Sequence, residues 1–480
     1  MDLIKQHAYI DGQWVQTPAA FDVINPATLE KIAQVSDCGT NEANAAVEAA
    51  AEAFPLWKNK LASERAAILQ KWKQLIIDNK EALAKLLTQE QGKPLKEALA
   101  EIANAEAVEW SAEEAKRCYG ETIPAFKADT QVLTYREAVG VVAAITPWNF
   151  PHSMITRKVA PALAAGCTVV LKPAQDTPLS ALALAALAEE AGFPKGVLNI
   201  VTAGKDNTEA VGKVLTTHDK VRKISFTGST QVGRALMKQA SDTVKKVSLE
   251  LGGNAPFIVF NSANLEQAVA GAVANKFRNA GQTCICANRI FVQADIHDKF
   301  VKAFKEKIKA MKMGNGLEPD TVIGPLINQA GLDKVEKLVR EAESKGAKIE
   351  TGGKAEKGGL FYEPTLLTDM ERGMRVFEDE IFGPVAPIYK FDTEEDAIKM
   401  ANDTIYGLAA YFYSNDLGQC MRVSQKLEYG MIGVNEIALS AASIPFGGFK
   451  QSGLGREGGP ESLSEFMETK YVLLGGLARV

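Results

Sequence analysis

The stretch Thr168-Val169-Val170-Leu171-Lys172-Pro173-Ala174-Gln175-Asp176-Thr177-Pro178 decides the fold class. Its first five residues form an apolar run of strand length. The segment that follows, Pro178–Ala191, is rich in alanine and leucine and carries a proline at the first turn, as helices often do. A strand that runs through a short turn into a helix is half of a βαβ unit. The stretch therefore predicts a parallel sheet covered by helices.

The same alternation continues downstream and supports an α/β fold. Five more segments before residue 250 continue the pattern, and a second alternating region follows them. The first group comprises strands Val197–Val201, Lys223–Phe226 and Val244–Leu249 with helices Thr208–Thr216 and Val232–Ala240. The second group comprises strands Phe257–Phe260, Ile290–Val292, Tyr411–Tyr413 and Met431–Val434 with helices Leu265–Arg278, Phe300–Met311 and Leu332–Ser344. Two α/β domains are therefore predicted.

The two ends of the chain show other patterns. Ala8–Val15 predicts a hairpin that turns at Asp11-Gly12, and Asn41–Leu95 is helical in character. Val139–Ile145 is an apolar run that predicts a strand. Lys470–Leu474 predicts a terminal strand, which either pairs with a partner subunit or closes its own sheet.

Length, charge and cysteine use restrict the class of protein. The 480 residues are too many for one ordinary core, and a net charge of −5 argues against nucleic acid or an anionic membrane as partner. No uncharged apolar run reaches the ~18 residues of a membrane span. Met1–His7 lacks the features of a signal peptide. Six scattered cysteines favour a reducing cytoplasm, and four scattered histidines give no metal-site pattern, so we expect no metal.

Polar residues follow the predicted strands at the positions where such sheets bind ligands. Asn149, Lys172, Gly228 and Glu250 all lie at or shortly after the end of a predicted strand. Cys284 lies beyond a helical segment, in a turn that contains glycine. A thiol, a carboxylate and a side-chain amide can together perform acyl transfer through a thioester. Each of the three has an ordinary structural interpretation when taken alone, so the hypothesis depends on a fold that brings them together.

Two glycine patterns match nucleotide-binding motifs only in part. Gly453–Gly458 has the spacing of the dinucleotide fingerprint, but no strand leads into it and no βαβ unit follows. Gly228–Ala235 resembles a phosphate loop, yet Arg234 and Ala235 replace the lysine and the hydroxyl residue that the loop requires. Its position between a strand and a helix would still place the Gly228 and Ser229 backbone amides near a pyrophosphate.

Six motifs spread along the chain carry a resemblance to a known family: Thr146–Pro151, Phe226–Thr230, Leu249–Gly253, Gly281–Cys284, Glu380–Pro384 and Pro445–Gly448. On these residues the chain resembles the NAD(P)-dependent aldehyde dehydrogenases from end to end. Within that family it is most similar to the succinate-semialdehyde dehydrogenases, on Met154–Lys158, Lys276–Cys286 and Gly453–Gly458.

The resemblance implies three parts. A Rossmann-like NAD(P)-binding domain would comprise residues 1–120 and 140–250, and an α/β catalytic domain residues 251–445. A small β extension for oligomerisation would combine residues 121–139 and 446–480. A homodimer or homotetramer is the expected assembly.

The resemblance also implies the catalytic roles. Cys284 would attack the aldehyde as the nucleophile, and Asn149 together with the Cys284 N–H would hold the oxyanion. Glu250 would activate the water that releases the acid, with Lys158 assisting proton transfer.

The cofactor would be NADP or NAD. Nine residues map onto family cofactor contacts, and among them Glu380 would hold the nicotinamide ribose. The full set is Trp148, Asn149, Lys172, Gln175, Gly228, Ser229, Leu251, Glu380 and Phe382. Position 175 departs from the strict NAD pattern, where a glutamate binds the adenosine ribose. Gln175 would not repel a 2′-phosphate and Lys172 could attract it, so we predict NADP or dual use.

The substrate would be a small semialdehyde with a distal carboxylate. Arg157 and Arg278 match positions that bind this group, and two guanidinium forks suit its two oxygens. Ala441 replaces a serine of the succinate enzymes, with Ser440 beside it. Succinate semialdehyde is therefore the first expectation, and glutarate or 2-oxoglutarate semialdehyde the alternative.

Several alternatives stay open. Cys286 could form a reversible disulfide with Cys284 that silences the nucleophile, or it is a buried spectator thiol. The chain could also be a CoA-acylating aldehyde dehydrogenase, a relative of γ-glutamyl-phosphate reductase, or a non-catalytic scaffold protein. Glu250 favours water as the acyl acceptor.

Overall fold

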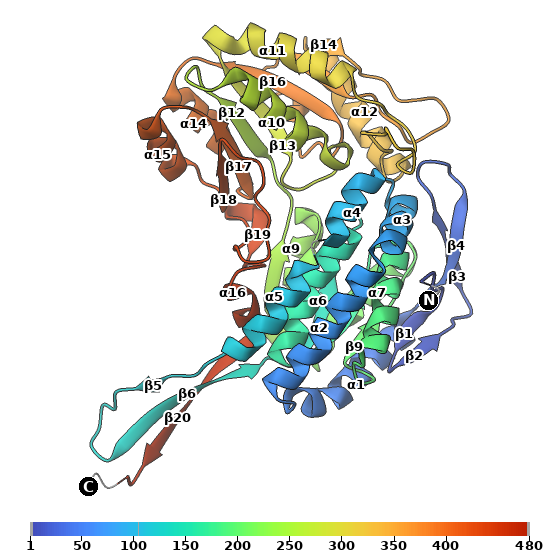
Figure 1. The fold of residues 1–480 in the computed structure, drawn as a ribbon, viewed down its shortest axis with the longest axis vertical. Helices are drawn as coiled ribbons and strands as arrows, with labels where there is room; N and C mark the ends of the chain where they lie inside the picture. The colour runs from blue at the N-terminus through green and yellow to red at the C-terminus, as the bar shows by residue number, and fades with distance from the viewer. Residues whose placement is uncertain (1–2, 104, 478–480) are drawn as a thin grey trace.

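The computed structural model describes residues 3–103 and 105–477. Two large sheets, each flanked by helices, lie one above the other in Figure 1, and a narrow three-stranded arm extends from the lower one. Among the helices of the described residues, none is both long and apolar enough to cross a membrane.

The first large sheet has eight strands in the order β19-β11-β10-β7-β8-β9-β1-β2. Strands β11, β10, β7, β8 and β9 run parallel to one another. At the edges, β19 pairs antiparallel with β11, β1 pairs antiparallel with β9, and β2 pairs antiparallel with β1. After β7 the chain places β8 and β9 on one side of that strand, and it then places β10 and β11 on the other side. The strand order therefore reverses between β7 and β10. The strands are β1 (Ala8–Ile10), β2 (Gln13–Val15), β7 (Val141–Ile145), β8 (Thr168–Lys172), β9 (Leu198–Ile200), β10 (Val221–Thr227), β11 (Lys246–Glu250) and β19 (Gly453–Leu454).

Helices cover both faces of this sheet, as its buried parallel strands require. One group contacts the sheet from one side through α1, α8 and α9, and another packs around α6 and α7 (Figure 1). The helices are α1 (Thr40–Lys58), α2 (Ala62–Asp78), α3 (Lys80–Gln91), α4 (Leu95–Ala103), α5 (Glu106–Glu114), α6 (Pro151–Ala165), α7 (Pro178–Ala191), α8 (Thr208–Thr217), α9 (Thr230–Ala240) and α16 (Glu461–Ser464). Short 3₁₀ turns are η1 (Ala115–Arg117), η2 (Ser241–Thr243) and η4 (Lys450–Ser452).

The second large sheet has seven strands in the order β14-β15-β16-β13-β12-β17-β18, parallel except for β14. Its strands are β12 (Ala255–Val259), β13 (Ala287–Gln293), β14 (Lys348–Thr351), β15 (Thr365–Thr368), β16 (Val385–Phe391), β17 (Ala409–Tyr413) and β18 (Met431–Val434). Its helices are α10 (Leu265–Phe277), η3 (Arg278–Gly281), α11 (Ala294–Lys309), α12 (Gln329–Ser344), α13 (Arg375–Glu378), α14 (Glu394–Asn402) and α15 (Leu417–Lys426).

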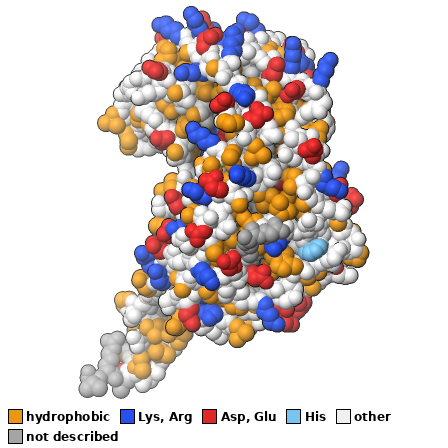
Figure 2. Space-filling model, turned by 45° about the vertical axis from the view of Figure 1, so that its right-hand side comes forward, with side chains coloured by type: hydrophobic (Ala, Val, Ile, Leu, Met, Phe, Trp, Pro, Cys, Tyr) orange, Lys and Arg blue, Asp and Glu red, His pale blue; other side chains and the backbone are white. Residues whose placement is uncertain are grey.

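The arm combines two distant parts of the chain. β20 (Met467–Gly475) pairs antiparallel with β6 (Thr130–Ala138), which also pairs with β5 (Thr122–Ile123). Apolar side chains stay exposed along it, and Figure 2 shows hydrophobic atoms gathered there. They include Phe126, Tyr135, Tyr471 and Leu473. A separate hairpin joins β3 (Ala20–Ile24) to β4 (Lys31–Ser36).

The predicted α/β class is confirmed, and most predicted elements lie within a few residues of the observed ones. Three points differ. The helical region Asn41–Leu95 is divided into separate helices, with a break at Gly92, whose φ of +94° is left-handed. Val244 lies outside the strand because its backbone is left-handed (φ 51°), so β11 begins at Lys246. At its other end, β11 includes Glu250 as its last residue, so Glu250 is not part of the following turn.

Candidate active site

A cavity of about 930 Å³ opens where the order of the first sheet reverses. Asn149 follows β7, and Gly228 and Ser229 follow β10, so the carboxyl ends of both strands contribute to it. Ligands of open α/β sheets bind at such a point. The lining residues are Pro147, Trp148, Asn149, Met154, Thr227, Gly228, Ser229, Leu251, Gly252, Gln282, Cys284, Ile327, Gly331, Lys334, Glu380 and Phe382.

A smaller cavity of about 430 Å³ shares Met154 and Cys284 with the first. It is lined by Phe150, Ser153, Met154, Arg157, Arg278, Thr283, Cys284, Ile285, Ser440 and Phe446. Cys284 therefore stands between two differently lined spaces. One space contains strand-end backbone and Glu380, and the other contains two arginines and aromatic rings.

The turn that carries Cys284 departs sharply from helical geometry. After α10, Asn279 and Ala280 both have positive φ angles, 50° and 54°. This conformation turns the chain back toward the link between the two sheets. There Gly253 approaches so closely that a Cβ would overlap the Cys284 carbonyl oxygen. Glycine is required at this position because any side chain would displace the cysteine.

The Cys284 environment disfavours the thiolate. Burial raises the pKa of the Cys284 thiol, and the nearby carboxylates of Glu380 and Glu250 raise it further. The sulfur is therefore protonated at neutral pH in the ligand-free site. A base or a bound positive charge must act on it before it can serve as a nucleophile.

Asn149 is buried and directed toward the cysteine segment. Its side-chain Nδ2 donates to the Gln282 carbonyl at 3.0 Å, two residues before Cys284. An amide NH₂ has two hydrogens, so the second stays available for a substrate oxygen.

Glu250 is a buried carboxyl group whose surroundings disfavour its charged form. Burial raises the pKa of Glu250 well above its usual range, and the neighbouring Glu457 contributes to the increase. Its Oε2 atom has no hydrogen-bond partner among the described residues. Glu457, in contrast, pairs with Lys158 and lies 3.7 Å from the Arg157 Nε, and these cations lower the pKa of Glu457. The pKa values of the two carboxyl groups are thus shifted in opposite directions, as in acid–base pairs of active sites.

The larger cavity combines a helix N-terminus with a carboxylate. Ser229 caps α9, because its Oγ accepts the Val232 N–H at 3.3 Å. Glu380 accepts the Gly253 N–H at 3.0 Å, and burial raises the pKa of Glu380 to about 7. The rings of Trp148 and Phe382 meet edge-on at 5.5 Å.

Two of the expected cofactor residues lie elsewhere. Gln175 lines a neighbouring cavity of about 930 Å³ together with Asp176 and Lys205, and this cavity shares Ile327 with the first. Lys172 is buried and lines neither space. Burial lowers the pKa of Lys172 to about 8, so its charge is poorly compensated there.

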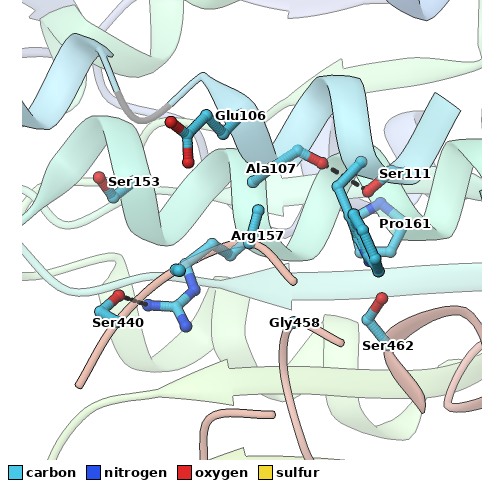
Figure 3. A pocket seen from close by; sticks show the side chains of 12 residues that line it. Glu106, Ala107, Ser111, Ser153, Arg157, Pro161, Ser440, Gly458 and Ser462 are labelled. Atoms are coloured by element: carbon cyan, nitrogen blue, oxygen red, sulfur yellow. Dashed lines mark hydrogen bonds between the residues drawn. The ribbon is translucent and has the colours of Figure 1, made fainter. Parts of the chain in front are cut away.

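The smaller cavity brings the expected substrate residues together. Arg157 Nη1 donates to the Ser440 Oγ at 3.3 Å and lies over the Phe446 ring at 4.3 Å. The guanidinium of Arg278 lies over the Phe150 ring at 4.9 Å. Figure 3 shows the Arg157–Ser440 contact at the edge of a third space of about 500 Å³, which Ala441 also lines.

Cys286 is close in sequence to Cys284 but differently placed. Its sulfur donates a hydrogen bond to the Gly281 carbonyl at 3.3 Å and accepts one from the Lys276 Nζ at 3.7 Å. Cys284 and Cys286 are both free thiols. The reversible disulfide between them stays a prediction.

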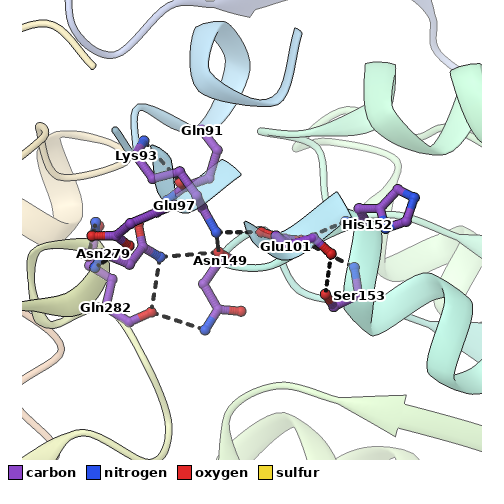
Figure 4. A network of polar contacts seen from close by, with 9 residues as sticks. All are labelled: Gln91, Lys93, Glu97, Glu101, Asn149, His152, Ser153, Asn279 and Gln282. Carbon is purple, nitrogen blue, oxygen red and sulfur yellow. Dashed lines mark hydrogen bonds and ion pairs between the residues drawn. The ribbon is translucent and has the colours of Figure 1, made fainter. Parts of the chain in front are cut away.

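The sequence interpretation missed several residues of this site. Glu457 lies inside the glycine pattern that we rejected as a fingerprint, and a charged residue among glycines was the available signal. Lys93, Glu101 and Asn279 also belong to the site region, and they form a buried polar network around the Asn149 backbone (Figure 4). Nothing in their local sequence predicted that arrangement, because α3, α4 and η3 meet only in the folded chain.

Comparison with known proteins identifies the family of this chain. The family model "Aldehyde dehydrogenase family" matches residues 14–472. A 3-sulfolactaldehyde dehydrogenase of Pseudomonas putida is 53% identical, over 99% of this chain and 98% of that protein. A mitochondrial succinate-semialdehyde dehydrogenase of Rattus norvegicus is 54% identical, over 99% of this chain and 92% of that protein.

Solved structures agree with the sequence relatives. The crystal structure of an E. coli NADP-dependent enzyme superposes with a TM-score of 0.97 at 50% identity, covering 99% of each chain. The resemblance that the motifs indicated is thereby confirmed: the chain belongs to the aldehyde dehydrogenase family.

Proposed function

We propose that this protein oxidises a carboxylate-bearing aldehyde, with succinate semialdehyde as the first candidate, to the acid with NAD(P)⁺. The observation that carries the proposal is the position of Cys284 between two cavities, one suited to a dinucleotide and one that holds Arg157 and Arg278. The relatives named for succinate semialdehyde and 3-sulfolactaldehyde act on small aldehydes with an anionic group, which agrees with the two arginines.

Cys284 is the nucleophile and Asn149 the oxyanion donor in this mechanism. Once a base has taken the thiol proton, the Cys284 thiolate attacks the aldehyde carbon, while the Asn149 amide and the Cys284 N–H stabilise the oxygen as it gains charge. Bound NAD(P)⁺ supplies the acceptor for the hydride that leaves this carbon. Cys284 then carries the acyl group as a thioester.

Glu250 is the base for thioester hydrolysis. Its raised pKa and its unpartnered Oε2 suit a carboxylate that takes a proton from water. Lys158 and Glu457 form the adjacent ion pair, which offers a route for that proton.

The residues of the larger cavity fit a dinucleotide. Backbone N–H groups at the start of α9 favour a pyrophosphate, and the Glu380 carboxylate can accept ribose hydroxyl hydrogens. Trp148, Gly228, Leu251 and Phe382 complete the cavity, and we assign Lys172 and Gln175 to the adenosine end, beside the neighbouring space.

Gln175 sets the cofactor preference in this scheme. We expect Gln175→Glu to lower the ratio of kcat/KM for NADP⁺ to that for NAD⁺ about tenfold or more, because the new carboxylate would repel a 2′-phosphate. Gln175→Met, which adds no charge, is the matched control and should keep the ratio within about threefold. Equal ratios in wild type and Gln175→Glu would remove Gln175 from the cofactor site.

Arg278 is the clearer test of the carboxylate site, since Arg157 also neutralises Glu457. We expect Arg278→Met to raise KM for succinate semialdehyde about 10- to 100-fold by removing a charge-assisted contact, while kcat/KM for uncharged butanal changes little. Steady-state kinetics on both aldehydes gives the comparison.

Arg372 provides the matched control for that variant. It is another exposed arginine over a phenylalanine ring, Phe377 at 5.9 Å, and lines neither cavity. Arg372→Met should leave both KM values unchanged. A similar change in KM for both aldehydes in Arg278→Met would contradict a carboxylate-binding role.

A panel of succinate, glutarate and 2-oxoglutarate semialdehydes with both cofactors tests the proposed function directly. Ala441 lines the third space beside Arg157, where the longer substrates would need room. A higher kcat/KM for glutarate semialdehyde would favour the longer class, and activity indifferent to the distal carboxylate would refute the substrate proposal. Product formation without CoA separates the enzyme from a CoA-acylating one.

The exposed arm and the free cysteines are the basis for proposing an assembly and a compartment. The exposed apolar side chains of the arm suit pairing with a second copy of the chain, so we propose a homodimer or homotetramer. A reducing cytoplasm suits six cysteines that all remain free thiols.

A further inference from the structure

A buried ion pair lies directly beneath the Asn149 segment. Lys93, in the turn between α3 and α4, and Glu101, in α4, are 0% and 1% exposed, and their Nζ and Oε2 atoms are 2.5 Å apart. Removing two charges from water is costly, so such a pair persists only where further polar contacts satisfy it. Those further contacts show what the pair holds.

Lys93 uses its remaining capacity on the Asn149 segment. The ammonium donates to the Asn149 backbone oxygen at 2.8 Å and lies 3.7 Å from the centre of the Phe150 ring. Glu101 uses its second oxygen, Oε1, to accept the N–H groups of His152 and Ser153 at 3.0 and 3.1 Å, in the first turn of α6. The pair thus contacts the segment from Asn149 to the first turn of α6 at Asn149, Phe150, His152 and Ser153 (Figure 4).

Asn279 connects the same oxygen to the cysteine turn. Its Nδ2 donates to the Asn149 carbonyl at 3.1 Å, and its Oδ1 accepts the Gln91 Nε2 at 3.0 Å. Its backbone N–H donates to Glu97 at 2.8 Å. Left-handed geometry at a non-glycine residue such as Asn279 is strained and persists only where the surroundings over-determine it. These contacts supply that constraint.

We propose that Lys93, paired with Glu101, is a positioning residue that fixes the Asn149 amide relative to Cys284. The inference rests on the proposed oxyanion role of Asn149. Lys93 and Asn279 converge on one carbonyl, so the Asn149 backbone is held from the α3–α4 side and from the cysteine side together. Its side chain in turn holds the Gln282 carbonyl. Loss of Lys93 frees the Asn149 donor to move, although every side chain of the proposed mechanism is still present.

The test compares variants that remove the pair without leaving an unpaired buried charge. Lys93→Met/Glu101→Gln keeps the side-chain volumes and removes both charges. We expect kcat to fall about 30- to 100-fold, less than for a deleted oxyanion donor, with an unchanged dissociation constant for NADPH measured by fluorescence. A loss confined to kcat would not follow from general loosening of the protein.

Lys223 offers a matched control. It is another buried lysine with a glutamate partner, Glu465 at 3.2 Å, and an aromatic neighbour, Phe466 at 5.2 Å, but it lines neither cavity. Lys223→Met/Glu465→Gln should lower Tm comparably and leave kcat within about twofold.

A double-mutant cycle with Asn149→Ala decides whether Lys93 acts through Asn149. We expect the Lys93→Met/Glu101→Gln changes to reduce kcat less than about threefold further when Asn149 is already alanine. A full additional loss in that background, or wild-type kcat in the folded pair variant, overturns the inference alone. Wild-type kcat in Asn149→Ala itself overturns the proposed oxyanion role as well.

Discussion

Replacing Cys284 by serine is expected to lower kcat for semialdehyde oxidation about 10³-fold or more. A buried hydroxyl has a far higher pKa than a thiol, and the same desolvation and carboxylates that raise the pKa of Cys284 would act on it. NAD(P)H formation followed by absorbance gives the rate. Binding of NADPH should be unchanged, because the sulfur lies at the boundary of the cofactor cavity and supplies no charge there.

Cys286→Ala is the control for that result. Its sulfur contacts Gly281 and Lys276 and lines neither cavity, so the variant should keep kcat within about threefold. Near-normal oxidation in Cys284→Ser, or a loss of equal size in Cys286→Ala, would contradict the assignment of the nucleophile. The same control variant tests the redox hypothesis: peroxide inactivation that persists without Cys286 would exclude a Cys284–Cys286 disulfide.

The sequence predicted the elements of the fold well where pattern and burial agree. Thr168–Lys172 and Pro178–Ala191 coincide with β8 and α7, because a fully buried strand and an alanine-rich helix both have clear patterns. The hairpin at Asp11-Gly12 was also predicted correctly. The start of β11 was wrong by two residues because Val244, although β-branched, takes a left-handed conformation at an exposed turn.

The sequence predicted candidate residues for the site, whose roles stay predictions, but it did not predict their arrangement. Family motifs named Cys284, Glu250 and Asn149. Of these, Asn149 and Cys284 line the larger cavity, and Cys284 also lines the smaller one. The network beneath them could not be predicted, because Lys93, Glu101 and Asn279 are ordinary polar residues in their local sequences. Their significance comes from burial at 0–1% exposure and from convergence on one carbonyl oxygen, both of which are properties of the tertiary structure.

Two neighbouring carboxyl groups with opposite pKa shifts give the site its division of labour. The cations of Lys158 and Arg157 lower the pKa of Glu457, whereas burial and the neighbouring Glu457 charge raise the pKa of Glu250. A protonated Glu250 would not hinder the approach of an anionic semialdehyde to Arg157 and Arg278. An ionised Glu250 is needed only when water must be activated. In the proposed mechanism, the titration of Glu250 would therefore affect both substrate binding and hydrolysis.

Glu250→Gln is expected to slow acyl release about 10³-fold while leaving thioester formation nearly intact. Rapid mixing should then show a burst of NAD(P)H close to one per subunit, followed by slow turnover. Mass spectrometry of quenched protein should find the acyl group on the Cys284 peptide. In wild type, steady turnover should rise with pH, because only the ionised carboxylate accepts a proton from water and the pKa of Glu250 is raised. Glu250→Gln should lose that dependence.

Glu457→Gln separates this base role from a general effect of charge. Removing the Glu457 carboxylate takes away one cause of the raised Glu250 pKa and leaves Lys158 and Arg157 beside it, so the rise in turnover should move to lower pH. No burst should appear, since the Glu250 carboxylate remains. Linear NAD(P)H formation in Glu250→Gln with no trapped acyl group would show that another residue releases the product. Rapid turnover of Glu250→Gln on addition of CoA would instead assign the acyl acceptor to a thiol and remove water from the mechanism.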